Sequence, residues 1–145
     1  MAEPTFDHER LDVYRLSIDY VAFSFPIART LKGVNRQARD QWIRAAQSIP
    51  LNIAEGHGKQ SLKDKNRFFE IARGSALECA AIHDVLRVCD AIDVDADGSG
   101  KSTLRRIVSM LTRLIQRTQA ASQASIEYEY EYRDAEYEYE SNPEA

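Results

Sequence analysis

Gly98-Ser99-Gly100-Lys101-Ser102 combines the residue types that hold nucleotide phosphates in other proteins. A phosphate-binding loop of that kind needs a further glycine five residues before Gly100, where this chain has Asp95. It also follows a buried strand, whereas the residues before this segment have the periodicity of a helix. The pattern is therefore incomplete, and it predicts no nucleotide site.

Asp93, Asp95 and Asp97, followed by a glycine, resemble the first half of an EF-hand calcium loop. The twelfth position of such a loop supplies a bidentate carboxylate, and here that position is Leu104. Aspartates are also common turn residues. We therefore interpret residues 93–102 as a connection between two helices that could bind calcium weakly but has no tight calcium site.

The histidines and cysteines give no better candidate for catalysis. Glu55 and His57, near a helix end flanked by glycines, are the candidate acid–base pair, but residues two apart on a helix do not face each other. Glu55 could instead serve as a buried structural carboxylate. Cys79 and Cys89 lie about 15 Å apart along one helical pattern, so we expect two buried, reduced thiols. No enzyme activity, metal or cofactor is predicted.

Basic residues form a stronger candidate site, because charge is divided unevenly along the chain. From Glu127 onward there are eight acidic residues and one basic residue, a net charge of −7. The rest of the chain has 18 basic and 15 acidic residues, a net charge of +3. Three arginines lie within roughly 40° of one another on a predicted helix, and three lysines supplement them. These residues are Arg106, Arg113, Arg117, Lys59, Lys63 and Lys65.

Helices must position these residues, since apolar residues recur at spacings of three and four along four segments. In the first segment, from about Glu9, the apolar positions are Leu11, Tyr14, Ile18, Val21, Phe25 and Ala28. Pro26 predicts a kink or break near Ala22–Phe25, because proline lacks the backbone donor. The second helix is expected to begin near Asn35, bend at Pro50 and end at Gly56 and Gly58.

The third helix is expected to begin with a cap at Ser61 and to carry two apolar stripes. The main stripe contains Phe68, Ser75, Cys79, Ile82, Leu86 and Cys89. The additional positions are Phe69, Ala76, Leu77 and Ala80. Because a surface helix of a monomer needs one apolar face, these additional positions predict either a central position for this helix or a subunit interface.

The fourth helix follows residue 102, and the polar segment Gln116–Ser125 leads out of it. Four helical patterns with short connections predict an all-α fold, an antiparallel up-down four-helix bundle. The expected core includes Trp42, Ile49, Ile53, Phe68, Cys79, Ile82, Leu111 and Leu114. Gly56 and Gly74 are expected where two helices approach closely. We predict a flexible lead-in at 1–8, a bundle domain at 9–121 and an acidic tail at 122–145.

The tail alternates glutamate with tyrosine between Glu127 and Glu140. Alternation and tyrosine content favour strand geometry, but the density of carboxylates opposes stacking of strands. We expect a solvated tail that is disordered or frays from the fourth helix. A role for the tyrosines in docking to a basic partner is the alternative.

Several motifs resemble the small bacterial four-helix-bundle proteins named after open reading frames in 23S rRNA intervening sequences. They are Leu11-Asp12-Val13-Tyr14, Phe25-Pro26, Gln41, the segment Ser48–Gly56 and Ala72-Arg73-Gly74-Ser75. The resemblance covers most of residues 9–118 and excludes the tail. It implies the bundle and a distant likeness to the accessory protein of diversity-generating retroelements, a homopentamer that binds nucleic acid and a reverse transcriptase. That protein is strongly basic, whereas this chain carries a net charge of −4.

Two functions from different classes follow. The first is a non-enzymatic, ring-like homo-oligomeric scaffold, a pentamer by resemblance, whose partner is itself or an unidentified protein. The alternative is an oligomer that binds RNA or DNA through the basic residues named above. The polar N-terminus lacks the features of a signal peptide, and no apolar run approaches the length that spans a bilayer. We therefore expect a cytoplasmic protein with no membrane partner.

Overall fold

The computed structural model describes residues 3–141, which form four α-helices and two short 3₁₀-helices without any strand. The elements are a 3₁₀-helix at Asp7–Arg10, α1 at Asp12–Ala28, a 3₁₀-helix at Gly33–Asn35, α2 at Arg36–His57, α3 at Leu62–Val88 and α4 at Val94–Ser141. The predicted all-α fold with four main helices is confirmed.

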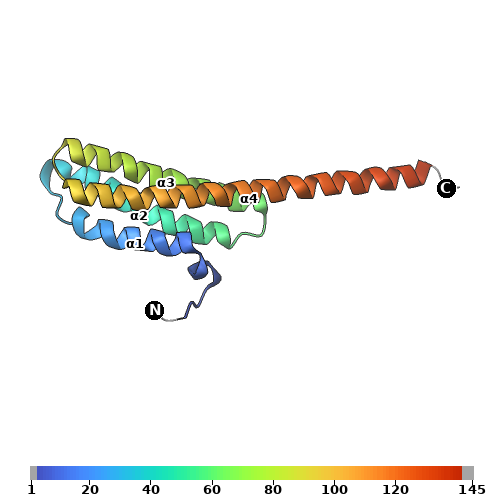
Figure 1. Ribbon diagram of the computed structural model, residues 1–145, viewed down its shortest axis with the longest axis horizontal. Coiled ribbons are helices and arrows are strands. Elements are labelled where there is room, and N and C mark those ends of the chain that lie inside the picture. Colours follow the sequence, from blue (N-terminus) through green and yellow to red (C-terminus); the bar gives the residue numbers. More distant parts are fainter. Residues whose placement is uncertain (1–2, 142–145) are drawn as a thin grey trace.

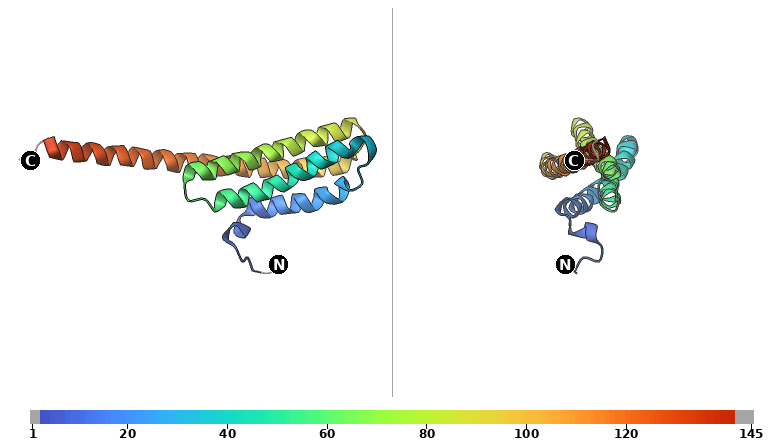
Figure 2. Two further views of the ribbon diagram at one scale, coloured as in Figure 1. Left: turned by 180° about the vertical axis from the view of Figure 1, so that it is seen from behind. Right: turned by 90° about the vertical axis from the view of Figure 1, so that its right-hand side faces the viewer.

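Consecutive helices lie side by side around a common core (Figures 1 and 2). The α1–α2 and α3–α4 connections lie at one end of the bundle, and the α2–α3 connection lies at the other (Figure 1). α4 contacts both α3 and α1 and then continues well beyond the bundle. Its first half is therefore part of the core, and its second half projects from the body.

α1 is a continuous helix that includes Pro26, so the predicted break near Ala22–Phe25 is wrong. The buried face of α1 also differs from the predicted apolar stripe. It consists of Val13, Ser17, Tyr20, Ser24 and Ala28. Four of the predicted apolar positions lie half-buried at the flanks, and Ile18 is 42% exposed.

Two serines can occupy the buried face of α1 because the helix itself satisfies their hydroxyl groups. Ser17 Oγ donates to the carbonyl of Tyr14 at 2.6 Å, and Ser24 Oγ donates to the carbonyl of Val21 at 3.2 Å. A buried hydroxyl with a partner avoids most of its desolvation cost. The small side chains of these two serines leave room for the neighbouring helices. The spacing of apolar residues alone does not reveal that serines occupy the buried face.

α2 begins at Arg36, next to the predicted Asn35, although the Asn35 side chain makes no capping hydrogen bond. Gly56 is required by packing, because a Cβ there would lie 2.9 Å from a ring carbon of Phe69. The predicted close approach at Gly56 is therefore confirmed. The left-handed conformation expected at the end of α2 is absent, since Gly58 is right-handed with φ of −76°.

α3 begins as predicted, with the Ser61 hydroxyl accepting a hydrogen bond from the amide of Asp64 at 3.3 Å. Its buried face contains Ser75, Cys79, Ile82 and Leu86 of the predicted stripe, but at its start Phe69 is buried and Phe68 is only half-buried. Cys79 is buried, but Cys89 lies exposed just after the helix, contrary to prediction. Gly74 is exposed with open space around it, so the predicted close contact there is wrong.

The core confirms most of the predicted residues. Fully buried or nearly so are Trp42, Ile49, Ile53, Cys79, Ile82 and Leu111. The predicted core residue Leu114 is half-buried and its neighbour Ile115 is buried instead. Two apolar residues adjacent in sequence point to different sides of a helix. Packing against the neighbouring helices decides which of the two is buried.

α4 begins at Val94, so the predicted connection at residues 93–102 is wrong over most of its length. The Asp93 carboxylate accepts a hydrogen bond from the amide of Ala96 at 2.8 Å and starts the helix. The helix then runs without a break to Ser141, across the predicted boundary between residues 121 and 122. The tail is thus helical as far as it is described, rather than disordered or strand-like. None of the helices within residues 3–141 is both long and apolar enough to span a membrane.

Candidate functional site

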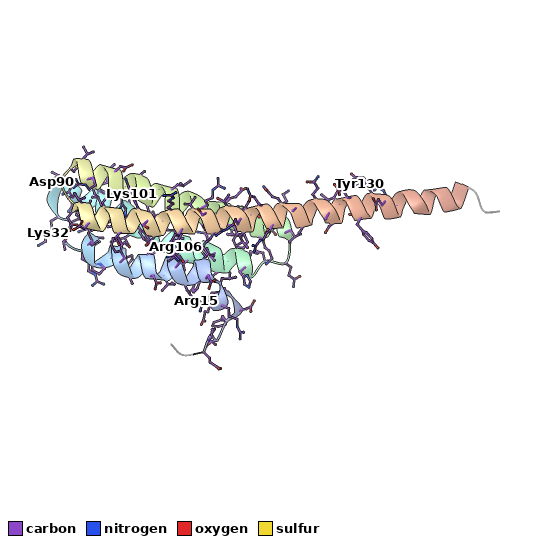
Figure 3. The ribbon with its side chains drawn as sticks, viewed as in Figure 1. Arg15, Lys32, Asp90, Lys101, Arg106 and Tyr130 are labelled. Atoms are coloured by element: carbon purple, nitrogen blue, oxygen red, sulfur yellow. The ribbon has the colours of Figure 1, made fainter. Side chains whose placement is uncertain are left out.

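The predicted arginines lie within the half of α4 that belongs to the bundle, where Figure 3 labels Arg106. Arg106, Arg113 and Arg117 are all exposed, and so is Arg105. Their spacing of seven and four residues keeps Arg106, Arg113 and Arg117 on one side of the helix. The structure therefore brings together the three arginines that the sequence singled out.

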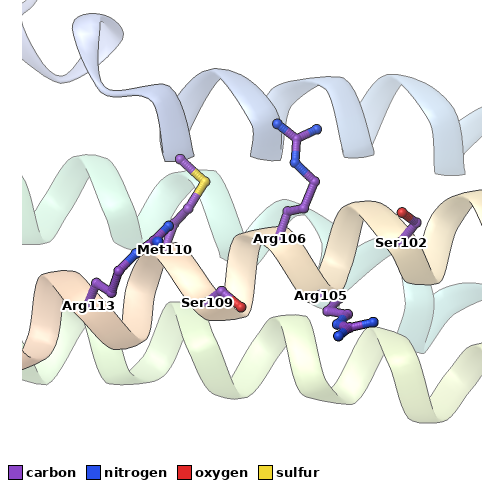
Figure 4. A pocket seen from close by; sticks show the side chains of 6 residues that line it. All are labelled: Ser102, Arg105, Arg106, Ser109, Met110 and Arg113. Atoms are coloured by element: carbon purple, nitrogen blue, oxygen red, sulfur yellow. The ribbon is translucent and has the colours of Figure 1, made fainter.

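Two surface grooves lie along this face. The first, about 470 Å³, is lined by Ser102, Arg105, Arg106, Ser109, Met110 and Arg113. In it Arg106 extends toward α1 and Arg105 toward α3 (Figure 4). The second, about 240 Å³, lies between α1 and α4 and is lined by Leu11, Asp12, Val13, Met110, Arg113, Leu114 and Arg117. Met110 and Arg113 belong to both grooves, so the two form one continuous surface, which we call the arginine face.

The arginines of this face have no carboxylate partner among the residues that the structure describes. Asp12 lines the second groove, but its carboxylate is paired with Arg15 at 2.7 Å. Guanidinium groups without a partner can make bidentate hydrogen bonds to phosphate or carboxylate. The arginine face is therefore suited to an extended anionic partner.

The predicted lysines lie elsewhere, near the α2–α3 connection. Lys59 pairs with Glu55 at 3.1 Å, and Lys65 Nζ donates to the carbonyl of His57 at 2.7 Å. Lys63 is exposed and lines a separate groove of about 520 Å³ between α3 and α4. Two of the three lysines thus stabilise the end of α2, and none shares a groove with the arginines.

Other site predictions also change in the structure. Glu55 is exposed rather than buried, and His57 pairs with Asp7 at 2.7 Å instead of with Glu55. Sequence reasoning missed Arg105 and Met110, although Arg105 directly precedes Arg106. Arg105 lies about 100° around the helix from Arg106, so only the groove connects it to the other arginines.

The predicted interface positions on α3 divide into two groups. Phe69 and Ala76 are buried within the chain, so they have no surface left for another subunit. Ala80 is half-buried, and Leu77 is 50% exposed. An outward line of apolar and small residues, spaced by three and four, runs through Leu77. We call it the α3 stripe, and it consists of Gly74, Leu77, Ala81, Val85 and Val88.

A chain of buried polar groups crosses the core near the start of α4. Trp42 Nε1 donates to the Tyr20 hydroxyl at 2.9 Å, and that hydroxyl donates to His83 Nε2 at 2.8 Å. His83 Nδ1 in turn donates to the Asp97 carboxylate at 3.2 Å. Burial lowers the pKa of His83 and so favours the neutral imidazole that this chain of donors requires.

The buried chain resembles an acid–base relay in composition, but its geometry assigns it a structural role. Tyr20 and His83 have no exposed surface, so a substrate has no path to either group. Gly100 packs against this site, where a Cβ would lie 2.7 Å from a ring carbon of Phe23. Among the side chains that the structure describes, no group of three or more histidine, cysteine or carboxylate side chains is arranged to hold a metal.

Comparison with known proteins agrees with the fold. A family model described as "23S rRNA-intervening sequence protein" matches residues 9–113. A solved structure from Bacteroides thetaiotaomicron, a protein of unknown function from the S23 ribosomal protein family, matches with a TM-score of 0.66 and 24% identity. The match covers 72% of this chain and 95% of that chain, and at this identity it shows the fold alone. No curated protein matches the chain. Arg117 and the α4 extension lie outside the family match.

Proposed function

Because the chain belongs to the 23S rRNA-intervening sequence protein family, we propose that it is a non-enzymatic, homo-oligomeric scaffold of antiparallel four-helix bundles. The structural relative from the S23 family is itself described as a protein of unknown function. The resemblance to the accessory protein of diversity-generating retroelements favours a ring of five subunits in the cytoplasm. Surfaces of the molecule that have no partner within one chain support an assembly.

The α3 stripe is the observation that carries this proposal. Leu77, Val85 and Val88 are 50%, 53% and 88% exposed, and Gly74 and Ala81 are exposed on the same side of the helix. A contiguous apolar surface of this kind is typical of a protein interface. The small residues allow a neighbouring helix to approach closely. A ring closes when one such heterologous contact repeats around its axis.

The scaffold proposal is tested by measuring the mass in solution with light scattering on a sizing column. We expect the wild-type mass to be a multiple of the 16.5 kDa chain. A Leu77→Glu/Val85→Glu variant should shift toward smaller assemblies, because two charges would be buried without partners. Val34→Glu is the control, since Val34 is 97% exposed and lies away from α3. A wild-type monomer, or a double variant of unchanged mass, would contradict the proposal.

Binding of RNA or DNA is the second candidate function, and the arginine face favours it. Four exposed arginines without a carboxylate partner along continuous grooves suit phosphate contacts, which weaken steeply with salt. An Arg106→Ala/Arg113→Ala/Arg117→Ala variant should lose affinity for a structured RNA measured at low salt. The Lys59→Ala/Lys63→Ala/Lys65→Ala variant is the matched control. Equal binding by the arginine variant and the wild type would refute this assignment, as would absence of binding even after truncation at Ser125.

A further inference from the structure

The heptad pattern of α4 changes the sign of its charge along the sequence. In the bundle half, Arg106, Met110, Arg113 and Arg117 follow one another at spacings of four, three and four residues. In the extension, Glu127, Glu131, Asp134 and Glu138 follow at the same spacings. These four acidic positions, which we call the acidic stripe, begin three heptads after Arg106. α4 therefore carries the same spacing of four, three and four residues twice. The first set contains three arginines and Met110, and the second contains four acidic residues.

Both patterns belong to one side of the helix. A straight α-helix drifts by about 20° per heptad, so three heptads separate the two sets by roughly 60° around the axis. Two helices that pair with a left-handed supercoil remove this drift and keep one heptad seam in contact. Since α4 is continuous from Val94 to Ser141, the arginine face and the acidic stripe lie on a single rigid element.

The two patterns are also related by symmetry about position 122. Arg106 and Glu138 lie equally far from this position on opposite sides, and the same holds for Arg113 and Glu131. It holds as well for Arg117 and Glu127, and for Ala120 and Ala124. In an antiparallel pair of identical helices centred at position 122, each residue therefore lies opposite its counterpart. Arg106, Arg113 and Arg117 each then face a glutamate of the other copy.

We propose that two copies of this chain pair through α4, antiparallel, with the acidic extension of each copy lying along the arginine face of the other. The contact is isologous, because each copy supplies both halves of the same surface. Exposed Ala120 and Ala124 meet at the two-fold axis, where small side chains allow the helix axes to approach closely. Tyr128 and Tyr130, 71% and 54% exposed, would be partly covered.

The dimensions of the molecule agree with this pairing. The distance along the helix from position 122 to Arg106 is about 24 Å, and an equal length of extension reaches Glu138, before the helix ends at Ser141. Beyond Ile126, which still lines a groove shared with α3, the extension projects away from the body with no other described element beside it (Figures 1 and 3). A straight helix cannot fold back onto its own arginines. The acidic stripe can reach an arginine face only in another copy.

The charge pattern also selects the direction of pairing and the partner. A parallel pair would place arginine opposite arginine and glutamate opposite glutamate, which is unfavourable at both ends. The antiparallel pair forms Arg–Glu contacts in both halves. RNA would compete with the extension for the same arginines. This pairing uses a different surface from the α3 stripe, so it does not depend on the proposed ring.

A charge exchange between two variants tests the pairing. The face variant carries Arg106→Glu/Arg113→Glu/Arg117→Glu, and the stripe variant carries Glu127→Lys/Glu131→Lys/Glu138→Lys. Each variant alone would face itself with like charges, so we expect its dimer to dissociate at least about tenfold more readily. In an equal mixture both halves of the interface become attractive again. Sedimentation should then recover a dimer that contains one chain of each kind.

Leu77→Glu/Val85→Glu can be added to both chains so that contacts through the α3 stripe do not contribute to the measured mass. Variants that remain folded by circular dichroism but fail to associate when mixed would overturn the proposal. Loss of RNA binding in the face variant, with the masses of all variants equal to that of the wild type, would assign the arginines to RNA and exclude the α4 pairing.

Oxidative cross-linking tests the register independently. In a Cys89→Ser background, Ala120→Cys/Ala124→Cys should form a covalent dimer, because position 120 lies opposite position 124 of the other copy. Gln119→Cys/Gln123→Cys is the matched control, with equal spacing on a different side of the exposed helix. Equal cross-linking by the control would overturn the register. Efficient cross-linking by Ala120→Cys alone would indicate parallel helices and contradict the proposal.

Discussion

The core of the bundle and the arginine face differ in whether their polar side chains find partners within the chain. Around Tyr20, His83 and Asp97, the polar groups are buried or half-buried, and each has a hydrogen-bond partner from another helix. Along the arginine face, the guanidinium groups are exposed and have no carboxylate partner in the described part of the chain. The first arrangement holds one chain together. The second leaves its interactions to another molecule, which is why we place function on α4 and stability in the core.

Removing one hydroxyl from the buried chain should produce the largest effect. Tyr20→Phe leaves both Trp42 Nε1 and His83 Nε2 without their partner in the core. Each of the two unsatisfied buried groups costs about 1–3 kcal/mol, so we expect the free energy of unfolding to fall by about 2–6 kcal/mol. Denaturant unfolding measures it. A loss below about 1 kcal/mol would mean that the chain of hydrogen bonds contributes little.

Two glycines of α4 provide a matched comparison between the core and the surface. Gly100→Ala places a Cβ against Phe23 and His83 and should destabilise the chain by about 1–3 kcal/mol. Gly98→Ala meets nothing within 4 Å and should stabilise the helix by up to about 1 kcal/mol, since alanine has the higher helix propensity. Thermal unfolding of both variants checks the difference in sign.

Acid should weaken the core through His83, whose pKa burial lowers below its usual value of 6.5. The unfolded chain then binds a proton more readily than the native chain, so stability is full above about pH 6.5 and declines below it. The slope contributed by this one group is at most about 1.4 kcal/mol per pH unit. Tyr20, Trp42, Asp97 and Lys101 surround the ring. His83→Gln should reduce this slope, and an unchanged slope in unfolding experiments between pH 7 and 5 would contradict the assignment.

The arginine face should matter least for the stability of the single chain. Arg106→Ala and Arg113→Ala remove exposed side chains without ion pairs, so we expect changes within about 0.5 kcal/mol. The comparison must be made at high salt, where contacts between copies are weakened. A loss as large as that of Tyr20→Phe would show that these arginines support the fold rather than a partner.

Sequence reasoning located the arginines but could not separate them from the lysines. Arg106, Arg113 and Arg117 lie on one helix, so helical spacing alone predicts a common face. Lys59 and Lys65 lie near the end of α2, and their ammonium groups contact Glu55 and a backbone carbonyl there. The Lys59–Glu55 pair is a local i, i+4 contact, whereas the Lys65 contact depends on where α2 and α3 meet, which no spacing within one helix reveals. Arg105 joined the site only because the groove beside α4 includes it.

The sequence by itself determined that this chain is an all-α protein of four main helices, because apolar spacing and caps such as Ser61 are local properties. Tertiary structure decided which face of each helix is buried. It placed Ser17 and Ser24 in the core, exposed Cys89 and Gly74, and required glycine at positions 56 and 100. The physical reason is that burial depends on the shape and partners that neighbouring helices offer. Those are set by residues far away in the chain.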